Sequence, residues 1–197
     1  MPAAIKWNLM SVDEYLASEL ASPIKHEYLG GVVYAMAGAR NLHNRIATNT
    51  LTALEGRLRG QCCQPFNSDT KIRIRMPTQT RFYYPDASVV CRPNPDHESF
   101  QDEPALIAEV LSKKTRRIDE GEKKDAYLTI PSLGIYLLIE QQAPLVTVYR
   151  RTDAGFVREV YEELNAVPLG GIETQLPLAE IYAGVEFTPE PDDQEDS

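Results

Sequence analysis

The chain has 197 residues, enough for one well-packed domain, and 43% of them are hydrophobic, as is usual for a globular protein. Its formal net charge of -9 argues against a protein that coats DNA through a broadly basic surface. No apolar run approaches the roughly eighteen residues of a membrane-spanning helix, and the N-terminus lacks the pattern of a secretory signal, so we expect a cytoplasmic protein with no membrane partner.

The first third of the chain predicts a helix, a hairpin and a longer helix. Residues 11–14 (SVDE) carry the pattern of a capping box, which predicts a helix that runs to about Leu20. In HEYLGGVVYAM, two strand-like runs are joined by a Gly-Gly pair at 30–31, which predicts a β-hairpin. From Leu42 onward, apolar residues recur at helical spacing, and Gly60 is a suitable end for this second helix.

The remainder predicts a sheet with one crossover. The expected strands are TKIRIRM, RFYYPDASVVC, ALIAEVL, GIYLLIE, and LVTVYRR paired with GFVREVY. The segment 113–130 is long enough for a crossover helix, and Pro131 would close it, so the flanking strands should form a parallel pair in an otherwise antiparallel sheet. We therefore predict an α/β fold with a mixed β-sheet flanked by helices. A single domain over residues 1–187 would be followed by a disordered acidic tail over 188–197.

Three cysteines, Cys62, Cys63 and Cys91, offer no clear framework. Their number is odd, two are adjacent, and no CxxC spacing occurs, so neither a set of disulfides nor a zinc ribbon is indicated. We expect reduced thiols that serve as ordinary packing residues.

Two carboxylates stand beside or within apolar strands. Glu109 interrupts ALIAEVL, and a buried ionised carboxylate is normally paired, neutralised or bound to a metal. Asp86 begins the neighbouring apolar run, although an Asp after Pro85 is also typical of a turn. If the two strands pair, both carboxylates can project from one region of the sheet, where Mg²⁺ would relieve their repulsion.

Cationic residues follow Glu109 along the chain. Lys113 and Lys114 come first, and then Asp119, Lys123 and Tyr127 follow at intervals of four, which makes one stripe on a helix. The stripe is either a salt-bridged solvent face, or it directs Lys123 toward the carboxylates to hold a phosphate or a nucleophilic water.

A second cationic set lies in TKIRIRM, where alternation places Lys71, Arg73 and Arg75 on one face of a strand. This face is either solvated or in contact with phosphate. No Walker A, GxGxxG, HExxH or GxSxG pattern occurs, which lowers the odds of the corresponding enzyme classes.

Taken in order, several motifs resemble the Uma-type endonuclease family of the PD-(D/E)XK restriction-endonuclease-like superfamily. They span nearly the whole folded chain and comprise HEYLGGVVYAMAGA, YYPDASVVC, EVLS, RRIDEGEKKDAY, IPSLGIYLLI and LPLAEIYAGVEF. The resemblance implies a restriction-endonuclease-like fold and hydrolysis of phosphodiester bonds in DNA with Mg²⁺, or Mn²⁺ as a substitute. It is also consistent with a homodimer, because cutting both strands commonly uses two active sites.

The resemblance assigns roles by motif. Asp86 matches the Asp of the "PD" motif, and Glu109 matches the acidic residue of the following strand, so both would hold the metal. Where the superfamily usually has its lysine, two residues after the Glu, this chain has Leu111. The lysine would then come from the next helix as Lys123, with Lys124 as the alternative register.

Other residues receive weaker assignments. Glu27 matches an acidic residue that such folds can bring beside the metal, although it could equally be a surface residue of the hairpin. His43 matches a histidine of the family, but a histidine at a helix start or core edge is the more common case. Lys113, Lys114 and Arg73 are the candidate DNA contacts. The alternative function is a non-catalytic binding module with a nuclease-like fold, and a small-molecule phosphodiesterase is also compatible with these motifs.

Overall fold

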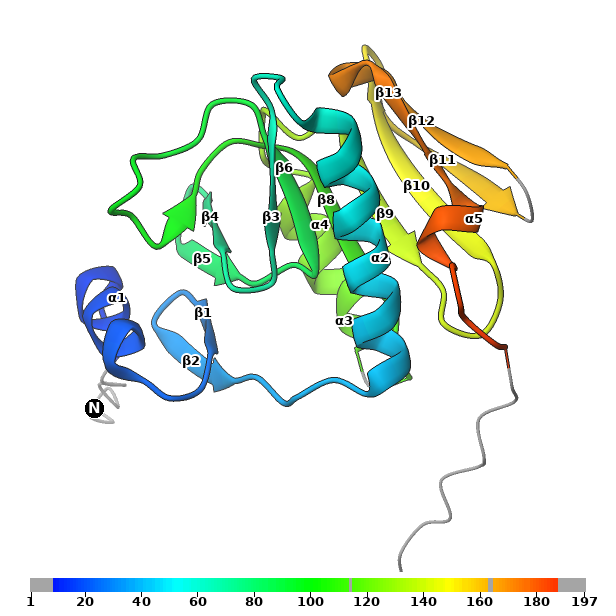
Figure 1. The fold of residues 1–197 in the computed structure, drawn as a ribbon. Helices are drawn as coiled ribbons and strands as arrows, with labels where there is room; N and C mark the ends of the chain where they lie inside the picture. The colour runs from blue at the N-terminus through cyan, green and yellow to red at the C-terminus, as the bar shows by residue number, and fades with distance from the viewer. Residues whose placement is uncertain (1–8, 114, 163–164, 188–197) are drawn as a thin grey trace, which may run out of the picture.

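The computed structural model describes residues 9–113, 115–162 and 165–187. The predicted acidic tail and Lys114 lie outside these ranges. Figure 1 shows a mixed α/β architecture, which confirms the predicted fold class. Across the described ranges, no helix has both the length and the apolar composition needed to cross a membrane.

The helices and strands follow one another as three sheets with helices packed against them. In chain order they are α1 (Val12–Ala21), β1 (His26–Leu29), β2 (Val32–Ala35), α2 (Asn41–Leu58), β3 (Gln64–Asn67), β4 (Lys71–Arg75), β5 (Thr80–Tyr83), β6 (Ala87–Val90), β7 (Phe100–Gln101), β8 (Pro104–Val110), α3 (Arg116–Ile118), η1 (Asp119–Lys123), α4 (Lys124–Tyr127), β9 (Ile135–Ile139), β10 (Leu145–Thr152), β11 (Gly155–Glu162), β12 (Ala166–Leu169), η2 (Gly170–Ile172), β13 (Thr174–Pro177) and α5 (Leu178–Ile181).

The N-terminal elements form as the local sequence predicts. Ser11 and Glu14 make both hydrogen bonds of the capping box at the start of α1. Gly30 and Gly31 both have positive φ, which suits the tight turn between β1 and β2. α2 ends at Leu58, two residues before Gly60.

Two larger sheets organise the molecule. The five-stranded sheet has the order β2-β1-β5-β4-β7, and the six-stranded sheet has the order β11-β10-β9-β8-β6-β3. In the second sheet, β8 and β9 are parallel, as predicted, and the helical segment α3-η1-α4 forms their crossover. The expected pairing of β10 with β11 also forms.

The apolar side chains separate into layers around these sheets. α2 packs on one face of the six-stranded sheet, where Leu54 and Ile46 join Leu106 and Leu137 in a buried cluster. The opposite face meets the five-stranded sheet and α4, and Ile107 and Tyr127 belong to this second cluster. α1 covers the outer face of the five-stranded sheet (Figure 1). The second cluster, between the sheets, is where the polar site described below is built.

One predicted strand is wrong in its extent. The sequence favours a continuous strand over 81–91, but the chain leaves the five-stranded sheet after Tyr83 and enters the six-stranded sheet at Ala87. Pro85, which has no N–H to donate to a ladder, lies in the break. Asp86 is therefore positioned at a junction between two sheets.

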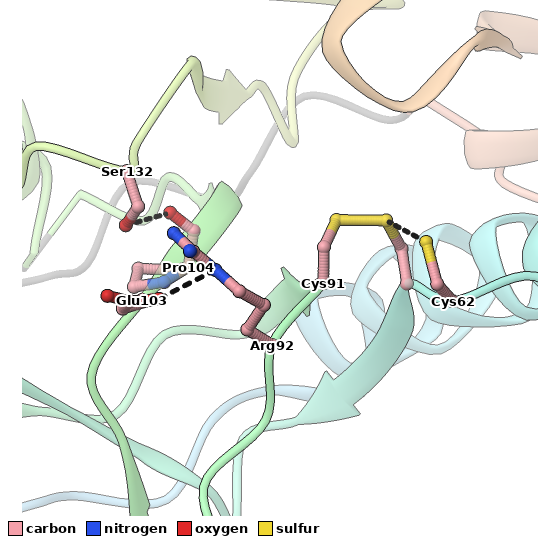
Figure 2. Close-up of a disulfide and its surroundings, with 7 residues drawn as sticks. Cys62, Cys91, Arg92, Glu103, Pro104 and Ser132 are labelled. Atoms are coloured by element: carbon pink, nitrogen blue, oxygen red, sulfur yellow. Dashed lines mark hydrogen bonds and ion pairs between the residues drawn. A yellow bond between two sulfur atoms is a disulfide. The ribbon is translucent and has the colours of Figure 1, made fainter.

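The expectation of three reduced cysteines is also wrong. Cys63 and Cys91 form a disulfide, whereas Cys62 is free and exposed (Figure 2). Cys63 precedes β3 and Cys91 follows β6, and these strands pair antiparallel with Gln64 opposite Val90, so the two cysteines meet directly. Because β3 was not predicted from the sequence, this pairing could not be foreseen.

The cationic face of β4 is exposed only at Arg75, whereas its other two cations are engaged with neighbouring side chains. Lys71 is buried under α1, where its ammonium lies 3.2 Å from the hydroxyl of Tyr84. Arg73 donates two hydrogen bonds of 2.7 Å to Asp102 and stacks over the ring of Phe100. Both side chains are thus engaged in fixing the outer face of the five-stranded sheet.

The Arg73–Asp102 pair should stabilise the fold in a pH-dependent way. Burial of Asp102 acts to raise its pKa, but hydrogen bonds from Arg73 and Asn94 outweigh burial and lower the pKa of Asp102 below its ordinary value. Asp102→Asn should reduce the free energy of unfolding at pH 7 by about 1–3 kcal/mol. A depressed carboxyl pKa stabilises the folded state above the unfolded pKa, so the deficit should shrink as the pH falls below about 4.

Urea unfolding of wild type and Asp102→Asn at pH 7, 5 and 3.5 measures this difference. Asp96→Asn, in an exposed loop, is the matched control and should leave the free energy of unfolding unchanged. An undiminished deficit at pH 3.5 would mean that the carboxylate charge of Asp102 is not its source.

Candidate active site

Asp86 and Glu109 meet across two paired strands. β6 and β8 run antiparallel with Ala87 opposite Ala108, so the preceding Asp86 comes opposite Glu109. The Val110 N–H donates a 2.7 Å hydrogen bond to Asp86 Oδ2, and the Asp86 N–H donates to Glu109 Oε2 at 3.4 Å. The pairing on which the sequence argument depended is therefore present.

The alternation of β8 explains why a carboxylate interrupts its apolar run. Ile107 and Leu111 point into the cluster between the two sheets, and Glu109, midway between them, points to the same side. Its side chain is only 5% exposed. The Tyr127 hydroxyl donates a 3.2 Å hydrogen bond to Glu109 Oε1, so the crossover helix supplies one of its partners.

Lys123 joins three acidic side chains from three different elements. Its ammonium lies 2.8 Å from Glu27 Oε1 in β1, 3.6 Å from Glu109 Oε1 in β8, and 3.7 Å from Asp119 Oδ1 in its own helical turn. That turn, η1, is a π-helix, a rare form that is frequent at functional sites. The structure thus brings Glu27 and Lys123 to the carboxylates.

Asp119 is a site residue whose importance the sequence reasoning missed. It was placed in one stripe with Lys123 and Tyr127, and the structure directs that stripe into the protein rather than toward solvent. Asp119 is buried, and within the described part of the chain its Oδ1 has no hydrogen-bond partner. The four-residue interval from Asp119 to Lys123 was the available signal, but a surface ion pair has the same spacing.

The alternative lysine occupies a different environment. The Lys124 ammonium lies 3.7 Å from Asp125 and 5.4 Å from the centre of the Tyr149 ring, and its side chain does not share the Lys123 contacts. Of the other predicted DNA contacts, Lys113 lies in the chain between β8 and the crossover helix. Arg73 is held by an ion pair with Asp102 at the five-stranded sheet. Lys114 lies outside the described residues.

His43 approaches the site from the opposite layer. It lies in the first turn of α2, and its Nε2 is 3.2 Å from Asp86 Oδ2. Burial acts to lower the pKa of His43, but the hydrogen bond and the charge of Asp86, with smaller contributions from Asn44 and Asp119, together raise it. His43 is therefore both a helix-start residue and a direct neighbour of Asp86.

The charges of the site are unbalanced. The described part of the site holds one ammonium, that of Lys123, and four carboxylates, those of Glu27, Asp86, Glu109 and Asp119. Burial, reinforced by the neighbouring carboxylates, raises the pKa of Glu109 well above its usual range despite Lys123. Burial opposes the charge on Lys123, yet the surrounding carboxylates raise its pKa. A phosphate would be repelled from such a site unless a cation accompanied it.

The donor set is suited to a hard divalent cation. Within the described ranges, no three His, Cys, Asp or Glu side chains are arranged to hold a metal ion together. Mg²⁺, however, is usually bound through one or two carboxylates plus water and substrate phosphate, and Asp86 and Glu109 supply such a pair. Glu27, predicted as a third ligand, is paired with Lys123 instead.

This chain is similar to known proteins along most of its length. A family model described as "Uma2: Putative restriction endonuclease" matches residues 12–179. A Synechocystis sp. protein, "Uncharacterized protein slr1290", is 35% identical over 181 residues, covering 90% of this chain and 94% of that protein. A second from the same organism, "Uncharacterized protein sll1609", is 32% identical over 146 residues, covering 73% and 81%.

A solved structure has a similar fold. It is described as the crystal structure of "a putative nuclease belonging to DUF820" from Anabaena variabilis. The TM-score is 0.66 at 18% sequence identity, and the match covers 85% of this chain and 96% of that one.

Proposed function

The chain belongs to the Uma2 family of restriction-endonuclease-like proteins, and from this premise we propose that it is a divalent-metal-dependent endonuclease that hydrolyses phosphodiester bonds in DNA. The observation that carries the proposal is the meeting of Asp86 and Glu109 across β6 and β8, with the Lys123 ammonium 3.6 Å from Glu109. A buried excess of carboxylates weakens a fold through mutual repulsion, and a bound Mg²⁺ ion would offset that excess.

Asp86 and Glu109 are the residues that would hold the cation. When bound, the cation would lower the pKa of a water molecule and stabilise negative charge on the phosphate. Tyr127 holds Glu109 through its hydroxyl, and His43 and the Val110 N–H hold Asp86. These contacts restrict the two carboxylates to one orientation, which favours a fixed site.

Lys123 would act on the phosphate itself. Its ammonium stays charged because the surrounding carboxylates raise its pKa, and it can neutralise charge that develops on phosphorus. Glu27 and Asp119 fix its position from two elements. In this proposal Asp119 is a positioning residue that acts through Lys123.

We also propose DNA contacts, an oligomeric state and a cellular location for the protein. Lys113 and Lys114, which follow β8 in the sequence, would contact the DNA backbone. A homodimer would provide one site for each strand of a duplex. A cytoplasmic location would give the protein access to DNA. The Cys63–Cys91 disulfide argues in the other direction, because disulfides are more usual in oxidising compartments.

Cleavage of plasmid and oligonucleotide DNA by the purified protein tests the proposed function. With Mg²⁺ or Mn²⁺ we expect phosphodiester hydrolysis, and a chelator should stop it. The absence of cleavage with either metal, on single- and double-stranded DNA alike, would contradict the proposal.

Metal binding should also be visible without catalysis. A cation that binds only the native state stabilises it, so millimolar Mg²⁺ or Mn²⁺ should raise the melting temperature by several degrees. Glu109→Gln keeps the side-chain shape but removes a ligand charge, and it should abolish most of this rise. Glu98→Gln, in a surface loop, should respond to metal as the wild type does. A melting temperature that does not respond to Mn²⁺ in the wild type would contradict the metal site.

A further inference from the structure

The β1–β2 hairpin places an exposed aromatic ring beside the candidate active site. Tyr34 in β2 is the direct cross-strand partner of Glu27 in β1. Directly opposed residues in an antiparallel pair project from the same face, with Cβ atoms about 4.5–5.5 Å apart. Glu27 points to Lys123, so Tyr34 stands on the active-site face at the rim of the site.

Tyr34 is exposed to solvent, unlike the other tyrosines of the site. Tyr34 is 52% exposed, whereas Tyr83 and Tyr127 are buried in the floor of the site. Among the described residues, β2 is the edge strand of its sheet, with no further strand beside it. Val32, two residues earlier and on the same face, is 42% exposed and extends the apolar surface along the rim.

The charge of the site makes a neutral contact useful for substrate binding. Four carboxylates share the site with one lysine, three of them in contact with its ammonium, so the DNA backbone gains little attraction from the protein's own charge there. Stacking of a base on an aromatic ring does not depend on charge, and it is independent of sequence because every base has a π-face. A base within a duplex already stacks on its neighbours and cannot offer that face without being displaced.

We propose that Tyr34 is a stacking platform for an unpaired nucleobase next to the phosphate held at Asp86 and Glu109, so that the preferred substrate is single-stranded or locally unpaired DNA. The inference rests on the proposed function, because the platform has a role only if DNA enters this site. Tyr34 contacts the base and sets specificity, and it takes no part in hydrolysis.

Binding of a short fluorescent oligonucleotide, single-stranded or in a duplex, tests the inference. Ca²⁺, which takes the same oxygen ligands, replaces Mg²⁺, and the oligonucleotide is checked for intactness after each titration. Tyr34→Leu keeps apolar bulk but removes the ring, and it should weaken single-strand binding about tenfold. Tyr34→Phe keeps the ring and should bind as the wild type does. Val160→Ala, on the exposed edge strand β11, is the distant control and should also be unchanged.

A base analogue within the strand gives a second readout. The fluorescence of 2-aminopurine is quenched by stacking, so quenching on binding should occur with wild type and Tyr34→Phe and be lost with Tyr34→Leu. Equal single-strand affinity and equal quenching in wild type and Tyr34→Leu would overturn the inference. If the wild type still cleaved DNA in that case, the proposed function would stand without the platform. A wild type that neither binds nor cleaves either form of DNA would overturn both.

Discussion

Asp86→Ala and Glu109→Ala should each abolish metal-dependent cleavage of DNA. Each substitution removes one of the two carboxylates that meet across β6 and β8, and a cation bound through two carboxylates loses most of its binding when one is missing.

The two variants should remain folded, for different reasons. Asp86 lies between strands, and its replacement removes the hydrogen bond from Val110 and the contact with His43 while leaving the buried apolar clusters intact. Removal of Glu109 relieves repulsion from the neighbouring carboxylates, which offsets the cavity left by the side chain. Circular dichroism and melting curves check the fold, and conversion of supercoiled plasmid measures cleavage.

Asp96→Ala, in an exposed loop, is the matched control and should cleave at the wild-type rate. Equal cleavage by wild type and Asp86→Ala would show that the activity came from a contaminant. The non-catalytic binding module would then be the better description of the protein.

Lys123→Ala should reduce the rate of cleavage about a hundredfold or more, whereas Lys124→Ala should have little effect. A preorganised charge beside a reacting phosphate contributes mainly as negative charge develops, so its loss lowers kcat more than metal affinity. Lys123 is in contact with Glu109, while Lys124 lies against Asp125 and Tyr149.

Single-turnover cleavage and a Mn²⁺ titration separate these two effects. Because Lys123→Ala leaves buried carboxylates without their cation, its melting temperature should fall in the absence of metal. The rate is therefore measured per folded molecule, and Lys123→Arg tests whether any cation suffices. A larger loss of rate in Lys124→Ala than in Lys123→Ala would assign the catalytic lysine to the other register.

Short sequence patterns predicted the helices and turns whose conformation is decided by residues close to them in the chain. The capping box, the Gly-Gly turn and the helical spacing after Leu42 each fixed an element because a neighbour within a few residues decides its conformation. The meeting of Asp86 and Glu109 was stated only as a condition, because two apolar runs in the sequence do not show that their strands pair.

Features set by distant contacts were missed. The separation of β5 from β6 at Pro85 depends on which sheet each half joins, and the Cys63–Cys91 disulfide depends on a strand with little apolar periodicity. Asp119 was assigned no function because its spacing to Lys123 is the same in a surface ion pair and in a buried one. The ion pair of Arg73 with Asp102 was not foreseen, because the two residues are 29 positions apart in the sequence.

The π-helical turn from Asp119 to Lys123 also affects how this chain is aligned with its relatives. Such a turn accommodates one residue more than a regular α-turn over the same stretch. A relative that lacks the extra residue can close the segment as an α-helix and still present its lysine at the same place. An ungapped alignment that starts before the turn would pair that lysine with Glu122. The gap belongs inside the turn, and the equivalent lysine is the one whose ammonium reaches the carboxylates of both β1 and β8.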